Sequence, residues 1–255
     1  MRRPGLQLGA AVVALALALP ALAYVMPVSA ILRRMGERRA ALSLSSLEVE
    51  GVLAAEGPAA ASVARAIGAD PAGRVISAPA VFRMKVPGRC RLELVVPDVP
   101  ESARPFVALR NDRVVGGGGL EQLPAAVAFV RGACALLATQ PAGSGAYASA
   151  LQRRGVALAH ASLGRFDGRI AYVVGGRAKD ARPLLYVEKD GFQPLRLISS
   201  EGGALLDVRL LGWGSPTGGD WFPRALQVWS GDAALLRFAT EKARANPKLA
   251  DLLFP

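Results

Sequence analysis

The residues that could do acid–base or metal chemistry are few in this chain, and they do not gather in a recognised motif. His160 is the only histidine, and it stands in an alternating apolar run, where a histidine is more often a packed or surface residue than a base. Metal sites of the usual type need three or four converging ligands, yet the sequence has no H-x-x-x-H, H-E-x-x-H or C-x-x-C pattern. We therefore expect neither a metal site nor a cofactor.

Two glycine-rich segments begin like catalytic or phosphate-binding motifs but do not complete them. Ser144 stands between two glycines without the G-x-S-x-G spacing of a nucleophile elbow, so it is better explained as a helix cap. Gly116–Gly119 lacks the following Gly-Lys-Ser/Thr of a phosphate loop and favours a flexible connection. Acids such as Glu188 and Asp207 are scattered, and although two acids can converge from distant strands in a glycosidase, nothing singles out a pair. We expect a binding protein and not an enzyme.

Cys90 and Cys134 are the only cysteines. In an exported protein an even pair favours one disulfide. It would close a loop of about 45 residues and contribute roughly 3 to 4 kcal/mol to stability. Two buried free thiols are the alternative, because sequence alone cannot show that the two side chains meet.

The N-terminus has the pattern of a secretory signal peptide over residues 1–23. Arg2 and Arg3 supply the charged region, 9–19 the apolar core, and Ala21-Leu22-Ala23 the cleavage site, with Val28-Ser29-Ala30 as a second candidate. An uncleaved anchor is the alternative, but the apolar run is shorter than the roughly 20 residues that a spanning helix needs. No cysteine follows the core, so no lipobox is present. We expect a mature, soluble, periplasmic chain, 24–255, that forms a single domain.

The chain is strongly basic, with a formal net charge of +11, while 52% of its residues are hydrophobic and 20% are charged. A basic surface can meet anionic lipid headgroups or nucleic acid. Arginine outnumbers lysine heavily and the charges are scattered, which indicates a compositional bias as much as a function. Export argues against nucleic acid, so transient contact with an anionic membrane surface is the one partner that the charge suggests.

Residues 168–254 have the pattern of an antiparallel β meander. Apolar runs of about seven to ten residues, a usual strand length, end at turn signals such as Asp190-Gly191. Within the runs the two sides alternate: Leu206 and Val208 face one way and Asp207 the other. A sheet with one dry and one wet face follows from this alternation.

The first half supplies more strands and an amphipathic helix over residues 29–42, which Ser29 can cap. Leu32 and Met35 fall near one face of this helix. The helix has a basic opposite side formed by Arg33, Arg34, Arg38 and Arg39. The expected strands are 44–53, 81–86, 89–96, 106–110 and 113–115, with a short helix or loop over 54–74. Two helices, a buried one over 124–137 and a polar-edged one over 144–154, interrupt the sheet midway.

Two segments of the meander have a more specific pattern. One is the hairpin that runs through Glu188-Lys189-Asp190 and returns through Gln193-Pro194-Leu195-Arg196-Leu197. The other is Trp221-Phe222-Pro223-Arg224, which opens a strand continuing through Leu226 and Val228. Both segments resemble the LolA/LolB-type lipoprotein-carrier fold, and the resemblance covers the last third of the chain well and the N-terminal helix and first strand loosely. It implies a mainly β fold with α (α+β), an antiparallel, curled half-barrel of about 9–11 strands with helices lidding its open side.

The function that this resemblance implies is binding lipid or lipoprotein acyl chains in an apolar trough and carrying them through the cell envelope. An envelope lipid-sensing or protein-docking module of the same fold, with envelope protein partners, is the alternative, and a structural protein with a filled core is a third. The side chains expected to line the trough and its lid are Leu32, Met35, Phe82, Met84, Leu92, Leu94, Leu206, Val208, Leu210, Leu226, Val228, Leu236 and Phe238.

Overall fold

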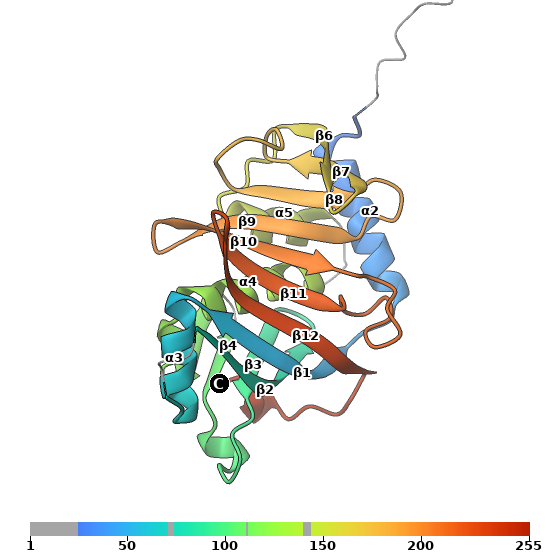
Figure 1. Ribbon diagram of the computed structural model, residues 1–255. Helices are drawn as coiled ribbons and strands as arrows, with labels where there is room; N and C mark the ends of the chain where they lie inside the picture. The colour runs from blue at the N-terminus through green and yellow to red at the C-terminus, as the bar shows by residue number, and fades with distance from the viewer. Residues whose placement is uncertain (1–24, 71–73, 111, 140–143) are drawn as a thin grey trace, which may run out of the picture.

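A computed structural model describes residues 25–70, 74–110, 112–139 and 144–255, so the expected signal peptide, 1–23, lies outside the described residues. The described part contains twelve strands in one antiparallel sheet (Figure 1). They are β1 (Ser46–Glu56), β2 (Val75–Lys85), β3 (Arg89–Leu94), β4 (Phe106–Arg110), β5 (Arg113–Gly117), β6 (Ala161–Phe166), β7 (Arg169–Val174), β8 (Leu184–Glu188), β9 (Pro194–Glu201), β10 (Ala204–Leu211), β11 (Ala225–Ser230) and β12 (Ala233–Ala245).

The sheet consists of two meanders joined at its centre. Its order is β5-β4-β3-β2-β1-β12-β11-β10-β9-β8-β7-β6, so the first and last strands pair with each other. Leu53 of β1 lies opposite Phe238 of β12, which places early and late parts of the chain side by side. The two ends of this order, β5 and β6, are not paired with each other, so the sheet is curled and open. The predicted α+β half-barrel is confirmed, with twelve strands in place of nine to eleven.

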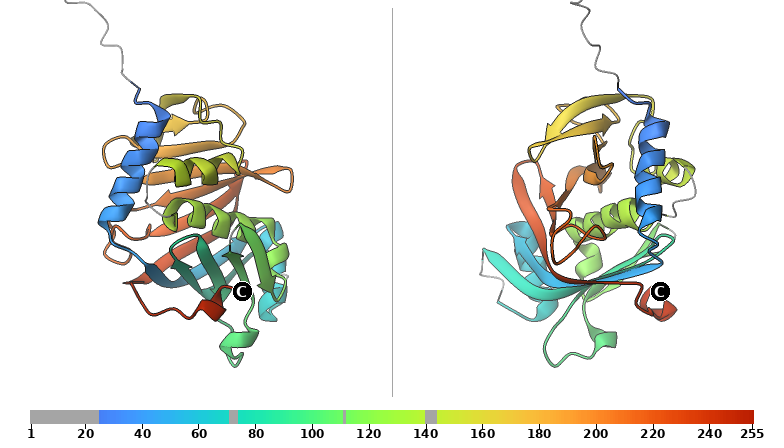
Figure 2. Two further views of the ribbon diagram at one scale, coloured as in Figure 1. Left: turned by 180° about the vertical axis from the view of Figure 1, so that it is seen from behind. Right: turned by 90° about the vertical axis from the view of Figure 1, so that its right-hand side faces the viewer.

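The helices gather mainly on one side of the sheet. Figure 2 shows α2 (Val28–Ala41), α4 (Pro124–Leu137) and α5 (Ser144–Gln152) on the inner side of the curl. The short helix α3 (Pro58–Ile67), in the segment where a helix or loop was expected, packs against β1 and β2. The predicted helices agree closely with these bounds, although the residue before the first turn of α2 is Pro27 and not the expected Ser29. No helix in the described ranges is long and apolar enough to cross a membrane.

The alternation in β10 produces the predicted dry face, because Leu206, Val208 and Leu210 are all buried. The opposite face of β10 is less exposed to water than expected. Asp207 was predicted on a wet side, but it is only 6% exposed. It accepts two hydrogen bonds of 2.8 Å from Arg196 and one of 2.7 Å from Arg209. The long arginine side chains cover the carboxylate, so cross-strand pairing and not water satisfies it.

A larger ionic network covers the outer face of β1, β2 and β3. Arg83 donates to Glu48 at 2.7 Å and to Glu93 at 3.3 Å, and Arg244 pairs with the second oxygen of Glu48. Burial alone would raise the pKa of Glu48, but the hydrogen bonds from Arg83 and Arg244 outweigh it and hold that pKa below its ordinary value of 4.5. The folded state therefore favours the ionised carboxylate.

This network predicts a specific loss of stability in acid. Because the pKa of Glu48 is depressed in the folded state, its contribution is present above about pH 4.5 and is lost as the pH falls through the folded pKa. Glu48→Gln should therefore weaken the dependence of the urea midpoint on pH between 7 and 3. Glu50→Gln is the control, since Glu50 is 45% exposed and 3.7 Å from Arg244. Equal pH dependence in wild type and Glu48→Gln would contradict this assignment.

The C-terminal tail lies across the outer face of the same strands. Asp251 accepts from Lys85 at 2.6 Å and from Arg89 at 2.7 Å, and the carbonyl of Leu253 accepts from Arg91 at 3.2 Å. Phe254 is completely buried. Just before Phe254 the tail forms one 3-10 turn, η3 (Asp251–Leu253).

Removal of the Phe254 ring should release this tail. We expect Phe254→Ala to cost up to about 3 kcal/mol in the free energy of unfolding, and to make the last residues sensitive to carboxypeptidase. Leu252→Ala should change stability by less than about 0.5 kcal/mol, because Leu252 is 81% exposed. Digestion of the wild-type tail at the same rate as the variant would show that the tail is not held.

Candidate functional site

The candidate site is the apolar interior between the sheet and the helices. The structure brings all thirteen predicted trough and lid residues into one buried cluster, and each is no more than 2% exposed. Leu32 and Met35 reach the interior from α2, and the other eleven come from five strands, β2, β3, β10, β11 and β12. Whether any of them contacts a ligand remains a prediction.

The inner face of the sheet includes buried residues beyond the thirteen that were predicted from the sequence. On this face, Val174 of β7 lies opposite Leu185 of β8, Leu185 lies opposite Leu197 of β9, and Leu197 lies opposite Val208 of β10. Val174, Leu185 and Leu197 are all fully buried. The sequence could have predicted that Leu197 faces the interior, because Leu195 and Leu197 alternate with Arg196 in the same way as the chosen residues of β10.

Helix α4 fills the centre of the interior. Its buried residues include five alanines and Gly132, so its backbone comes close to the sheet. A Cβ at Gly132 would lie only 3.0 to 3.2 Å from the side-chain carbons of Val208 on β10. Small residues are thus required where the helix crosses this strand, and the central part of the interior has little spare volume.

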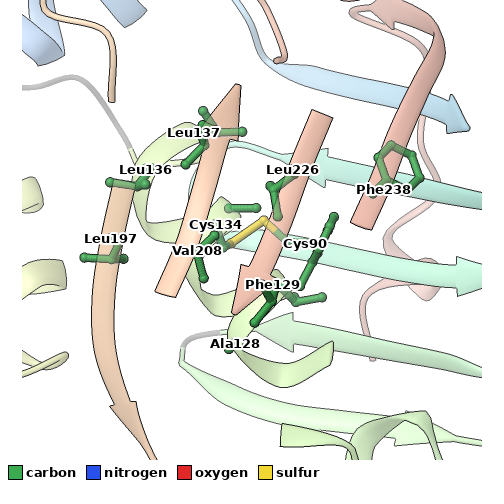
Figure 3. Close-up of a cluster of buried hydrophobic side chains, with 14 of the residues drawn as sticks. Cys90, Ala128, Phe129, Cys134, Leu136, Leu137, Leu197, Val208, Leu226 and Phe238 are labelled. Carbon is green, nitrogen blue, oxygen red and sulfur yellow. A yellow bond between two sulfur atoms is a disulfide. The ribbon is translucent and has the colours of Figure 1, made fainter. Parts of the chain in front are cut away.

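A disulfide fixes α4 to the sheet. Cys90 on β3 is bonded to Cys134 on α4, with the two Cα atoms 5.8 Å apart. Figure 3 shows this bond among buried side chains that include Phe129, Val208 and Leu226. The expected disulfide is confirmed and the free-thiol alternative is not realised. Because the bond is covalent, α4 is the helix least able to leave the sheet.

Four phenylalanines form the centre of the apolar cluster. The ring of Phe82 lies 5.8 Å from Phe129 and 5.3 Å from Phe222, and Phe238 lies 5.9 Å from Phe129, measured between ring centroids. Phe82 and Phe238 were expected to face the interior, and Phe129 was expected to be buried in its helix. Phe222 was missed, because it lies in the loop before β11 and has no periodic pattern to mark it.

Arg39 corrects the prediction for α2. It was placed on the basic outer side, but it is only 7% exposed. It donates to the carbonyl of Trp221 at 3.0 Å and to that of Leu137, at the end of α4, at 3.1 Å. Burial lowers the pKa of Arg39 to about 10, so the guanidinium is still charged at neutral pH. The sequence could have predicted this position, since Arg39 follows Met35 by four residues and therefore lies on the same face of the helix.

Arg39 therefore connects three parts of the lid region: α2, the end of α4 and the loop before β11. Tyr147 of α5 is also fully buried, with its hydroxyl 3.5 Å from the carbonyl of Leu136. Burial raises the pKa of Tyr147 to about 12, so it stays neutral. Apolar side chains, including Ile31 of α2 and Leu151 of α5, also pack these helices against the interior, and Arg38 of α2 pairs with Asp220 at 3.3 Å.

Several open cavities lie at the surface of the described part of the chain. Five pockets in the described residues have volumes of about 120 to 470 Å³, and none is lined by any of the thirteen predicted residues. Each of the thirteen is also no more than 2% exposed, so side chains fill the space around them in this conformation. A ligand could enter it only if part of the helical layer moved.

No protein-family model and no curated protein matches the sequence. Among solved structures, the chain is similar to a LolA superfamily protein from Nitrosomonas europaea at 14% identity, with a TM-score of 0.47, covering 91% of this chain and 98% of that one. It is similar to a DUF1329 family protein from Desulfovibrio piger at 12% identity, with a TM-score of 0.44 and coverage of 91% and 98%. It is also similar to MucB at 17% identity, with a TM-score of 0.27, covering 89% of this chain and 62% of MucB.

The first of these neighbours has the type of fold that the sequence resemblance implied. With every identity below 20% and every TM-score below 0.5, these likenesses do not bear on what the chain binds or does. A functional proposal has to come from the residues of the chain itself.

Proposed function

We propose that this chain is an envelope protein that binds the acyl chains of a lipid or lipoprotein between its sheet and its helices, and that it acts as their carrier. The observation that carries the proposal is the continuous apolar interior under a helical layer that is only partly fixed. The sheet is open, and α4 alone among the helices is bonded covalently to it. Movement of α2 and α5 would expose the interior while the disulfide keeps α4 in place.

The energies are compatible with reversible binding. Each buried methylene of an acyl chain contributes about 0.8 kcal/mol, so eight of them give roughly 6 kcal/mol. Part of this gain offsets the separation of Leu32 and Met35 of α2 from the interior. A site that must open at such a cost holds its ligand less tightly than a permanently empty cavity does. Limited affinity suits a carrier, which has to release its cargo.

The proposal places the protein in an exported compartment, and its disulfide supports that location. The Cys90–Cys134 disulfide is of a kind that persists in oxidising compartments such as the periplasm. The proposal assigns the protein no catalytic role. His160 is exposed, away from the apolar interior, and buried acids such as Glu93 and Asp207 are occupied by arginines.

The test is uptake of a fluorescent C16 fatty acid by the purified mature chain and by two variants. Val208→Phe adds volume to the interior next to Gly132 of α4 and should reduce uptake at least several-fold. Val81→Phe makes the same substitution one residue before Phe82 in β2. The Val81 side chain points to the outer face, so this variant should leave uptake unchanged. Both variants must first show wild-type circular dichroism. Uptake that is equal in the two variants would place the fatty acid outside the interior.

A second candidate is a protein-docking module of the same fold with no transport role. The filled interior favours it, because a module that only presents its surface to an envelope partner needs no empty trough. This candidate predicts no fatty-acid uptake by wild type or by Val81→Phe. The same experiment therefore separates the two functions.

A further inference from the structure

A half-open pocket of about 410 Å³ lies at the surface where the end of α5 approaches the turn between β2 and β3. Its walls are formed mainly by Pro87, Leu109, Asp112, Cys134, Arg153 and Arg154. None of its lining residues belongs to the thirteen predicted for the interior. The pocket is therefore a separate place at which a ligand could bind, and it is open without any movement of the helices.

Two arginines in this pocket share a single carboxylate. Arg153 donates through Nε to Asp112 at 2.9 Å, and Arg154 donates through Nη2 to the other oxygen of Asp112 at 3.1 Å. The two guanidinium groups and one carboxylate leave a net positive charge. Burial tends to raise the pKa of Asp112, but Arg154, Arg153 and the nearby Arg131 outweigh it and lower that pKa. The surroundings of the pocket thus favour negative charge.

Arg154 is an unusual side chain for a purely structural ion pair. Its side chain is only 7% exposed, and its buried Nε has no hydrogen-bond partner. A buried donor without a partner typically costs about 1 to 3 kcal/mol. Such a group calls for a specific explanation, and a ligand that draws the guanidinium into new hydrogen bonds would supply one.

Apart from Thr139 and Gly88, the rest of the pocket wall is apolar. Leu109, Cys134, Ala135 and Ala150 line it together with Pro87. We propose that this pocket is an anion site, in which Arg153 and Arg154 hold the phosphate group of a small amphiphile and Leu109 and Ala150 contact its apolar stem. Arginine suits this role because its planar fork of donors matches phosphate oxygens. The same chemistry is offered by a lipid headgroup and by free phosphate.

Titration of the isotope-labelled mature chain with hexyl phosphate and, separately, with inorganic phosphate tests the site. We expect hexyl phosphate to shift the backbone amide resonances of Gly88, Thr139 and Ala150 and not those of Val208 or Leu226 in the interior. Inorganic phosphate should shift the same pocket amides more weakly. Equal affinity for the two would overturn the role of the apolar stem. No shift at the pocket amides, or shifts confined to the interior, would overturn the site itself.

Three substitutions separate binding from structure. Arg153→Met should weaken hexyl phosphate binding about fivefold, whereas Arg182→Met should not change it. Arg182 is the matched control, since it is 50% exposed and paired with Asp180, and Arg153 is 54% exposed and paired with Asp112. Asp112→Asn should tighten binding about fivefold, because it frees both arginines and removes a competing negative charge. If Asp112→Asn weakens binding, the arginines only stabilise Asp112 and the proposal fails.

These results do not depend on uptake into the interior. Fatty-acid uptake can fail while hexyl phosphate shifts the pocket amides, and the reverse can also occur. The pocket and the interior are thus tested independently.

Discussion

Glu93→Gln is expected to lower the free energy of unfolding by about 3 to 5 kcal/mol. The Glu93 side chain is completely buried under the outer face of the sheet. It accepts from Arg91 at 3.0 Å, and from Arg83 and Arg104 at 3.3 Å each. The amide keeps the shape of the side chain but removes its charge. Arg83 and Arg91, which are 11% and 7% exposed, would then be left with too little negative charge around them.

The matched control is Glu101→Gln, which removes a carboxylate from the same network. Glu101 pairs with Arg83 at 3.0 Å but is 52% exposed, so its loss should cost less than about 1 kcal/mol. Urea unfolding of the two variants at pH 7 measures the difference. If the two variants lose equal stability, burial does not determine the strength of this network.

Loss of the Cys90–Cys134 bond is expected to cost about 3 to 4 kcal/mol, because the bond closes a long loop in the unfolded chain. The two cysteines are 44 residues apart in sequence. Unfolding in urea with and without dithiothreitol should therefore show a lower midpoint in the reducing buffer. The double variant Cys90→Ala/Cys134→Ala should start near the reduced value and should not respond to dithiothreitol.

The same bond should also affect the motion of the helical layer. If α4 is held by the disulfide while α2 and α5 open, reduction should increase amide hydrogen exchange in α4 more than in α2. Protection in α4 that does not change on reduction would show that packing alone holds this helix. That packing includes the close approach of Gly132 to Val208.

Many strands and helices of the fold could be predicted because each has its own local pattern of apolar and polar residues. The alternation of Leu206, Asp207 and Val208 identified the strand and the face that it buries, and the apolar run of 124–137 identified a buried helix. Pairing between distant strands could not be read in this way. Nothing local in β1 indicates that Leu53 will lie opposite Phe238, because this contact depends on how both meanders curl.

The outer face shows a second limit of local patterns. Alternation correctly separated Asp207 from the apolar side chains, but it could not show that arginines and the C-terminal tail would cover the outer face. The pocket at Arg153 and Arg154 was missed for the same reason. Asp112 reaches these arginines only because the β4–β5 hairpin and the end of α5 come together in the folded chain.

The central claim is that the interior accepts an acyl chain. Native mass spectrometry of the mature chain tests it most directly, after detergent-free equilibration with phospholipid vesicles and a triacylated lipopeptide, alongside a known fatty-acid-binding protein as a positive control. We predict a one-to-one complex whose added mass is that of an acylated molecule, and its absence in Val208→Phe. If the chain keeps its unliganded mass while the positive control takes up lipid, the interior is an ordinary core and the carrier function is wrong.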